Sequence, residues 1–197
     1  MRGVFYSVLF LLSSGPVLSQ KVSAGIESSL LFSRIKGNGM DASLRQGYEL
    51  GAWVRYGIGG RWSVRPGLYY SFEHFRAAGN FTTYFVNQSR SSGYNADVYL
   101  SSLHIPVLLQ YLLLPKLGIQ AGMEFSFVSE EDSKLLKSTQ RVFRNSGRAA
   151  VLGTEIQLRP VHFYVRYKYG LSNVNNITSV HRWTIQGLQA GIGLRLF

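Results

Sequence analysis

Two serines, a histidine and a glutamate within one stretch of the chain have the residue types of a hydrolytic triad. Residues 103–127, LHIPVLLQYLLLPKLGIQAGMEFSF, alternate apolar and polar side chains on both sides of a short Leu-Pro-Lys break. If that break is the turn of a hairpin, His104 lies opposite Ser126. Glu124 and Ser102 then share the face of His104. A serine beside a histidine that a carboxylate orients is the arrangement of a nucleophilic hydrolase.

The elements that would position these residues are two strands. A period of two on both arms predicts a β-hairpin. One face of residues 103–127 is bulky and apolar throughout, whereas the other carries His, Gln and Glu together with the small residue Gly. Large apolar side chains outside and small or polar ones inside are typical of strands that cross a lipid bilayer as part of a barrel. This alternation by itself brings the polar residues together in a crowded interior without access for a substrate, so we expect no catalytic residues.

The rest of the chain repeats this pattern. Four polar segments (34–46, 78–97, 130–148 and 172–182) separate strands at every second connection, and the other connections have two or three residues. Alternating long and short connections indicate an all-β fold, an eight-stranded antiparallel up-and-down transmembrane β-barrel with its short turns on the periplasmic side. The predicted strands are 22–33, 47–58, 62–77, the two arms of 103–127, 149–159, 161–171 and 183–197.

The N-terminus is typical of a secretory signal peptide. Arg2 precedes an apolar run at residues 4–12, and Ser-Ser-Gly-Pro follows it. A run of this length is well short of the roughly 20 residues that a membrane-spanning helix needs. We therefore expect a cleaved signal peptide at residues 1–19 and an outer-membrane β-barrel domain at 20–197. Both ends of the mature chain would then lie at the periplasmic rim.

Composition narrows the function classes. The 197 residues suit one domain, and the absence of Cys excludes disulfides and thiolate metal sites. The formal net charge is +11, but the basic residues are scattered and form no basic helix or stripe, so we expect no nucleic-acid partner. The four histidines lie far apart in the sequence without spaced carboxylates, which predicts no metal site and no cofactor.

The inward positions of the predicted strands collect charged side chains of both signs. An eight-stranded barrel is just wide enough for side chains to fill it, and buried charges must be paired. We therefore predict a lumen plugged by a salt-bridge network and no diffusion pore. The predicted network consists of Glu27, Glu49, Arg55, Arg65, Glu73, His104, Glu124, Glu155, Arg166 and Lys168.

Much of the remaining positive charge falls in or beside the long loops. On a Gram-negative cell that side faces lipopolysaccharide, whose phosphates are the expected partners of these cations. The other interpretation is that the charge only keeps the loops soluble. The candidate lipopolysaccharide-contacting cations are Arg34, Lys36, Arg90, Lys134, Lys137, Arg141, Arg144 and Arg182.

Aromatic residues near the predicted strand ends suit the two membrane interfaces, where such residues form girdles. The candidates are Trp62, Phe75, Phe127, Tyr169 and Trp183. The C-terminal Phe197 departs from this pattern. It falls on the opposite face from Leu194 and Leu196, so either it lies past the lipid boundary or a bulge shifts the phase of the last strand.

LHIPVLLQYLL followed by LGIQAGMEFSF, with RWSVRPGLYYSF and the closing GLQAGIGLRLF, resembles the small outer-membrane β-barrel domain family, the PorT-like or "porin family" group. The resemblance implies the barrel fold and an outer-membrane location. Most members have no assigned activity, and one branch is associated with protein secretion across the outer membrane.

Several functions remain open. The first is a non-enzymatic structural or surface-binding role through the loops at 78–97 and 130–148. The second, which the resemblance implies, is an accessory role in protein secretion or outer-membrane assembly, with a protein partner at the extracellular loops or the periplasmic rim. A lipid-modifying hydrolase is the weaker alternative. A soluble ligand carrier would need an apolar interior, which the faces of these strands contradict.

Overall fold

Strands make up most of the chain. The computed structural model describes residues 22–41, 43–85, 97–133, 136, 141–178 and 180–197. No helix among these residues is long and apolar enough to cross a membrane. The elements are β1 (Val22–Lys36), β2 (Arg45–Gly59), β3 (Trp62–Arg76), a single helical turn α3 (Phe81–Tyr84), β4 (Asp97–Leu114), β5 (Leu117–Ser133), β6 (Ser146–Leu158), β7 (Val161–Gly170) and β8 (Thr184–Arg195).

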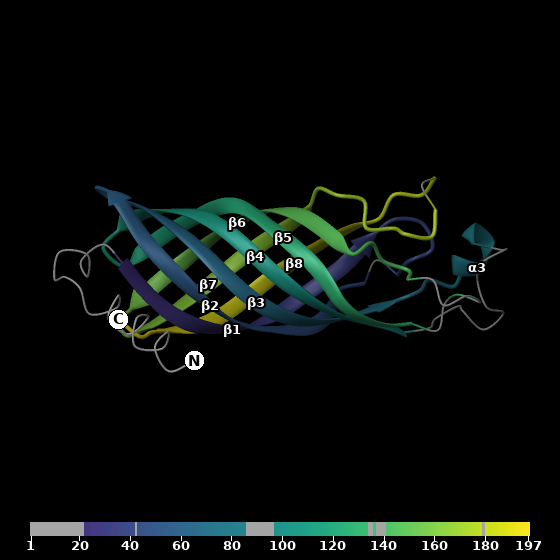
Figure 1. The fold of residues 1–197 in the computed structure, drawn as a ribbon, viewed down its shortest axis with the longest axis horizontal. Coiled ribbons are helices and arrows are strands. Elements are labelled where there is room, and N and C mark those ends of the chain that lie inside the picture. The colour runs from purple at the N-terminus through teal and green to yellow at the C-terminus, as the bar shows by residue number, and fades with distance from the viewer. Residues whose placement is uncertain (1–21, 42, 86–96, 134–135, 137–140, 179) are drawn as a thin grey trace, which may run out of the picture.

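The strands form one closed barrel in sequence order. Each strand pairs antiparallel with the next, and β8 pairs with β1 from Gly25↔Arg195 to Lys36↔Thr184. Figure 1 shows the strands tilted against the long axis of the barrel. Because every strand has two neighbours, the sheet has no open edge. The prediction of an eight-stranded antiparallel up-and-down barrel is confirmed.

The side chains point as the sequence predicts. On the outer wall, Leu109, Ile119 and Val165 are 41%, 43% and 47% exposed, whereas Glu124 and Arg166, on the inner wall, are 5% and 2% exposed. The barrel therefore has an apolar exterior and a polar interior, the reverse of a soluble barrel. The hairpin of β4 and β5 also has the expected pairing, with His104 opposite Ser126.

All long connections leave the barrel at one end. They join β1 to β2, β3 to β4, β5 to β6 and β7 to β8, whereas the short turns and the C-terminus lie at the opposite end (Figure 1). β4 and β5 extend further toward the long loops than predicted, since β4 begins at Asp97 and β5 continues to Ser133. β8 ends at Arg195, so Phe197 lies past the last strand, where it is 63% exposed. The predicted signal peptide, residues 1–19, lies outside the described residues.

The loop end of the barrel has an apolar core of its own, which the sequence analysis did not predict. We call this assembly the cap. Trp183 is fully buried at its centre, packs against Phe85 and Phe143 with ring centroids 5.6 and 5.9 Å away, and donates its indole N–H to the Asn38 carbonyl at 2.9 Å. The buried members of the cap core are Ile35, Met40, Phe75, Ala77, Phe81, Phe85, Val98, Leu100, Leu136, Val142, Phe143, Val174, Ile177 and Trp183.

The cap corrects part of the predicted aromatic girdles. Trp62, Phe127 and Tyr169 are 45%, 46% and 48% exposed on the outer wall, as a girdle requires. Phe75 and Trp183 are instead buried in the cap core at 2% and 0% exposure. Both lie at strand ends beyond the apolar wall, where inward-facing side chains meet loops rather than the polar lumen.

We expect the cap core to protect the loops at this end of the barrel from proteolysis. Trp183→Ala removes the central ring and its hydrogen bond, which weakens the cap by about 3–5 kcal/mol. We expect proteases to cleave the loops of this variant faster, while the strands of the barrel stay protected. Val180→Ala is the control, because Val180 is a loop residue that is 80% exposed. Equal cleavage of the two variants would show that the loops do not depend on this core.

Candidate functional site

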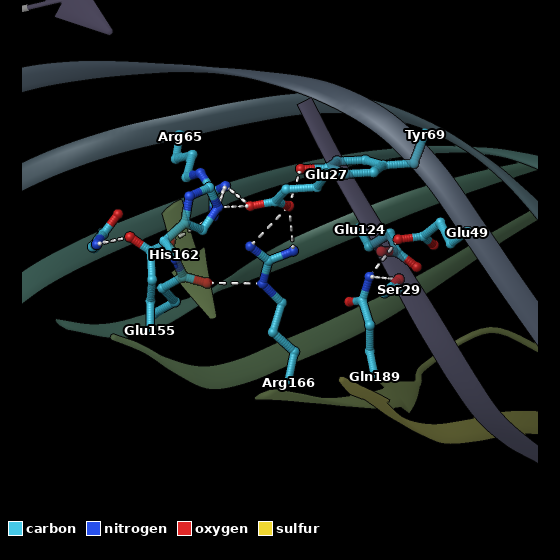
Figure 2. Close-up of polar contacts among 12 residues, drawn as sticks. Glu27, Ser29, Glu49, Arg65, Tyr69, Glu124, Glu155, His162, Arg166 and Gln189 are labelled. Atoms are coloured by element: carbon cyan, nitrogen blue, oxygen red, sulfur yellow. Dashed lines mark hydrogen bonds and ion pairs between the residues drawn. The ribbon is translucent and has the colours of Figure 1, made fainter. Parts of the chain in front are cut away.

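The structure places all members of the predicted charge network inside the barrel. Arg55 is half-buried near the end with the short turns, and each of the others is at most 9% exposed. They come from seven of the eight strands, each from an inward-facing position. Except for Glu73, they gather into two groups along the barrel axis, shown in part in Figure 2.

The first group surrounds two buried glutamates, and we call it the Glu27–Glu155 cluster. Glu155 accepts hydrogen bonds from Arg55 at 2.6 Å and Arg65 at 3.0 Å. Two amides, Gln110 and Gln120, also donate to Glu155, at 3.2 and 2.8 Å. This carboxylate therefore has four donors in the interior, which is what a fully buried charge requires.

Glu27 is held in the same way. Arg65 forms a close ion pair with Glu27, the Tyr69 hydroxyl donates to it at 2.8 Å, and His162 Nε2 lies 2.5 Å from its carboxylate. Arg166 lies 3.4 Å away and also donates to the Gln120 carbonyl oxygen at 2.8 Å. Arg65 thus bridges both glutamates and links the cluster into one network (Figure 2).

Aromatic rings complete the packing around these charges. The Arg65 guanidinium lies 4.4 Å from the centre of the Trp53 ring, and that of Arg166 lies 3.9 Å from the Tyr164 ring. Both distances fit cation–π contacts. Tyr69 has room for its ring because its neighbours Gly51 and Gly67 have no side chains, since a Cβ at either position would lie within 2.4 Å of that ring.

The second group centres on Lys168, and we call it the Lys168 cluster. The ammonium of Lys168 lies 2.9 Å from Glu49 and 2.8 Å from Glu124. Gln189 bridges Glu49 to Ser29. Glu49, His104 and Glu124 each offer a donor atom within 4.8 Å of the others, a spacing that could hold a metal ion. The ammonium already takes the place of such a cation, so these residues fit an internal salt bridge better than a metal.

The lumen also contains a serine–histidine–glutamate chain, but not the predicted one. His104 Nδ1 lies 2.7 Å from Glu124, and its Nε2 lies 2.9 Å from the hydroxyl of Ser71. Ser71 comes from β3, where it pairs with Ser102, so the serine nearest His104 lies on the neighbouring strand rather than in the hairpin. The only sequence signal for Ser71 was its inward position.

The row of Ser71, His104 and Glu124 lacks the surroundings of a hydrolase site. Ser71 is fully buried at 0% exposure, which leaves no space for a substrate carbonyl beside its hydroxyl. Most of the surrounding backbone lies in the β3–β4 and β4–β5 ladders, where paired strand N–H groups bond to neighbouring strands. An oxyanion hole needs N–H groups that are free to point at the reacting atom. The arrangement therefore satisfies the polar atoms of His104 and does not supply a catalytic nucleophile.

On the outer wall, four cations lie just beyond the apolar surface at the loop end. Arg34 and Lys36 are exposed on β1, where they pair with Gln186 and Thr184 of β8. Arg182 donates to the Leu171 carbonyl at 2.6 Å, and the Leu171 N–H donates to the Arg148 carbonyl at 2.8 Å. We call Arg34, Lys36, Arg148 and Arg182 the outer cation patch.

A surface groove runs through this patch. Lys36, Tyr169, Leu171 and Arg182 contribute to its lining, and its volume is about 390 Å³. None of the four patch cations forms an ion pair with another described residue. Cations without acidic partners next to an apolar wall are suited to anionic groups at a lipid surface.

The other predicted loop cations are placed differently. Arg141 and Arg144 are exposed on the cap, where Arg141 donates to Asn145 and Arg144 donates to the Asn175 carbonyl, both at 3.0 Å. Arg90, Lys134 and Lys137 lie outside the described residues. At the same end, beyond the apolar wall, Arg76 donates to Asp97 at 2.8 Å, and this hydrogen bond lowers the pKa of Asp97 to about 2.

A closed eight-stranded cylinder with an apolar wall, a charge-filled lumen and cations at one rim defines a class, the small outer-membrane β-barrels. Residues 18–176 match the outer membrane protein beta-barrel domain family, and the chain belongs to that family. It is therefore an outer-membrane protein, as the resemblance in its sequence implied. No sequence of a curated protein matches the chain.

Two of the solved structures that match the chain illustrate the shared fold. Neisserial surface protein A superposes with a TM-score of 0.55 at 13% identity, over 88% of this chain and 97% of that one. Ail, the attachment invasion locus protein of Yersinia pestis, solved in complex with the heparin analogue sucrose octasulfate, superposes with a TM-score of 0.52 at 15% identity, over 89% of this chain and 99% of that one. At these identities the likeness extends to the fold alone.

The Glu27–Glu155 cluster makes a measurable contribution to stability. Glu155→Ala removes the acid that pairs with Arg55 and one of the two that pair with Arg65, which we expect to lower the free energy of unfolding by about 3–5 kcal/mol. Urea unfolding of the barrel in lipid vesicles measures this change. Glu130→Ala, at an exposed position of β5, should change it by less than about 0.5 kcal/mol. Similar losses in the two variants would contradict the role given to the cluster.

Proposed function

We propose that the protein is a non-conducting, non-enzymatic surface barrel that is anchored by lipopolysaccharide and displays its cap outside the cell. The observation that carries this proposal is that side chains fill most of the length of the barrel. The Glu27–Glu155 cluster and the Lys168 cluster occupy the lumen, and the cap core lies above them. A barrel that is filled with paired side chains supports a structural or binding role better than solute transport.

The outer cation patch supports the anchoring part of the proposal. Arg34 and Lys36 follow directly after the outward apolar residues Leu30 and Phe32 on β1, so their charges lie where lipid headgroups begin. Phosphates of lipopolysaccharide would then lie in the groove between Lys36 and Arg182, with Tyr169 beside them. Each such cation near an anionic lipid surface contributes about 1 kcal/mol.

The cap supports the display part of the proposal. Its buried aromatic core gives the loop end a defined shape, which a binding surface needs in order to avoid the entropy loss of ordering flexible loops. The exposed cations Arg141 and Arg144 lie on this cap and make anionic partners the favoured class.

Reversal of two patch charges tests the anchoring. In Arg34→Glu/Lys36→Glu, two favourable contacts with phosphate are lost, and we expect lipopolysaccharide to bind roughly 30-fold more weakly. The measurement is the affinity of the purified barrel for lipopolysaccharide at fixed salt. Arg61→Glu/Lys116→Glu is the matched control, since these two exposed cations lie in the short turns at the opposite end. An equal loss in both pairs would refute a specific role for the patch.

Electrical recording tests the closed lumen. We expect the protein in a planar bilayer to show no steady conductance comparable to that of a general porin, because paired side chains fill its interior. A porin-like current would overturn the proposal. In cells, a block in the export of other proteins after deletion of the chain would support the accessory role in secretion instead.

A further inference from the structure

A chamber lies inside the barrel between the Lys168 cluster and the cap. Its volume is about 60 Å³. Its floor includes His104, Glu124 and Lys168, and its roof includes Phe143 and Val174 of the cap core. The proposed function does not use this space.

One charged side chain lining the chamber is unlike the others in the lumen. Glu73 is 7% exposed and faces inward from β3, one inward position above Ser71 and one below Phe75. Among the described residues, no side chain or backbone group forms a hydrogen bond or ion pair with its carboxylate. Glu27, Glu49, Glu124 and Glu155 each have at least two such partners. A carboxylate that faces a chamber and has no partner in the described part of the protein is placed to pair with a cationic group that enters the chamber.

The two basic groups on the floor of the chamber are already engaged. Lys168 already lies between Glu49 and Glu124 at 2.9 and 2.8 Å. Both ring nitrogens of His104 are also engaged, one by Glu124 and one by Ser71. Glu73 is thus the carboxylate in the chamber lining that has no partner among the described residues.

The rest of the lining indicates which kind of cation fits. Apolar side chains form much of the wall, among them Leu31, Leu100, Val128 and Ile185. A metal ion needs several oxygen ligands, but of the two carboxylates in the lining Glu124 is already paired with His104 and Lys168, which leaves Glu73 with serine hydroxyls alone. An ammonium group on a short alkyl stem matches both features, with its charge at Glu73 and its stem against the apolar wall. At roughly 10–15 Å³ for each water-sized group, the chamber accommodates about four to six non-hydrogen atoms.

We propose that the chamber is a binding site for a small alkylammonium ion, in which Glu73 pairs with the ammonium group and the apolar wall contacts the stem. Two lining residues, Arg144 and Arg148, are exposed, so the chamber reaches the surface next to the first residues of β6. Their positive charges repel an ammonium ion, and salt weakens this repulsion.

Binding of n-butylammonium to the full-length barrel in micelles of an uncharged detergent tests the site. Ligand-observed NMR in about 0.5 M salt, which screens the rim arginines, should show saturable binding. Glu73→Gln should weaken it more than tenfold, because the amide keeps the shape and removes the charge. Glu130→Gln, at an exposed position, should leave the affinity unchanged. Ala149→Leu keeps Glu73 and fills part of the chamber, so it should also weaken binding.

The unliganded proteins give a second readout. Glu73→Gln removes an unmatched buried charge and should raise the midpoint of thermal unfolding, whereas n-butylammonium should raise the midpoint of the native protein alone. Equal binding to the native protein and Glu73→Gln would overturn the proposal, as would equally tight binding of butyrate. No binding at ligand concentrations up to about 10 mM, or saturation by Ca²⁺ without amine binding, would also overturn it. None of these results bears on lipopolysaccharide binding or conductance, so the proposed function stands or falls separately.

Discussion

The closure of the sheet is the constraint on which the rest of this structure depends. Lipid offers no hydrogen-bond partners, so every backbone N–H and C=O that crosses it must be paired within the protein. Pairing of β8 with β1 removes the last free edge. Once the cylinder is closed, alternation along each strand leaves only two surroundings for side chains, the lipid and a narrow interior. The apolar wall and the charged lumen are two consequences of the same pairing.

The interior resolves a second problem, the burial of charge in a narrow space. Arg65 joins Glu27 to Glu155, and Lys168 joins Glu49 to Glu124, so each of these acids is matched by bases and by neutral donors such as Gln120 and Tyr69. Trp53 and Tyr164 provide ring faces for the guanidinium groups of Arg65 and Arg166, which also pair with these acids. Toward the loop end the interior changes from polar to apolar, and the chamber with Glu73 lies at that change.

Much of this architecture could be predicted from the sequence, because the alternation of apolar and polar residues along a strand shows which side chains face lipid and which face the lumen. The faces of Leu109 and Glu124, the pairing of His104 with Ser126 and the alternation of long and short loops are all local properties. The contact of Ser71 with His104 depends on how β3 aligns with β4, which alternation does not specify. The prediction that Phe75 and Trp183 belong to the girdles was wrong for a related reason. Whether an inward-facing residue at a strand end meets the polar lumen or a core formed by loops depends on how far the strand extends. Which glutamate lacks a partner is likewise a property of the assembled barrel.

The layout of the two charged clusters also bears on how neighbouring strands choose their alignment. Sliding one strand past another by two residues keeps every apolar side chain in lipid, so the hydrophobic effect does not discriminate between the two arrangements. A slide of β3 moves Arg65 away from Glu27 and Glu155, and a slide of β7 moves Lys168 away from Glu49 and Glu124, so buried acids lose their partners. The ion pairs of the interior therefore disfavour shifted strand registers that the apolar outer wall alone would tolerate. They favour a single register.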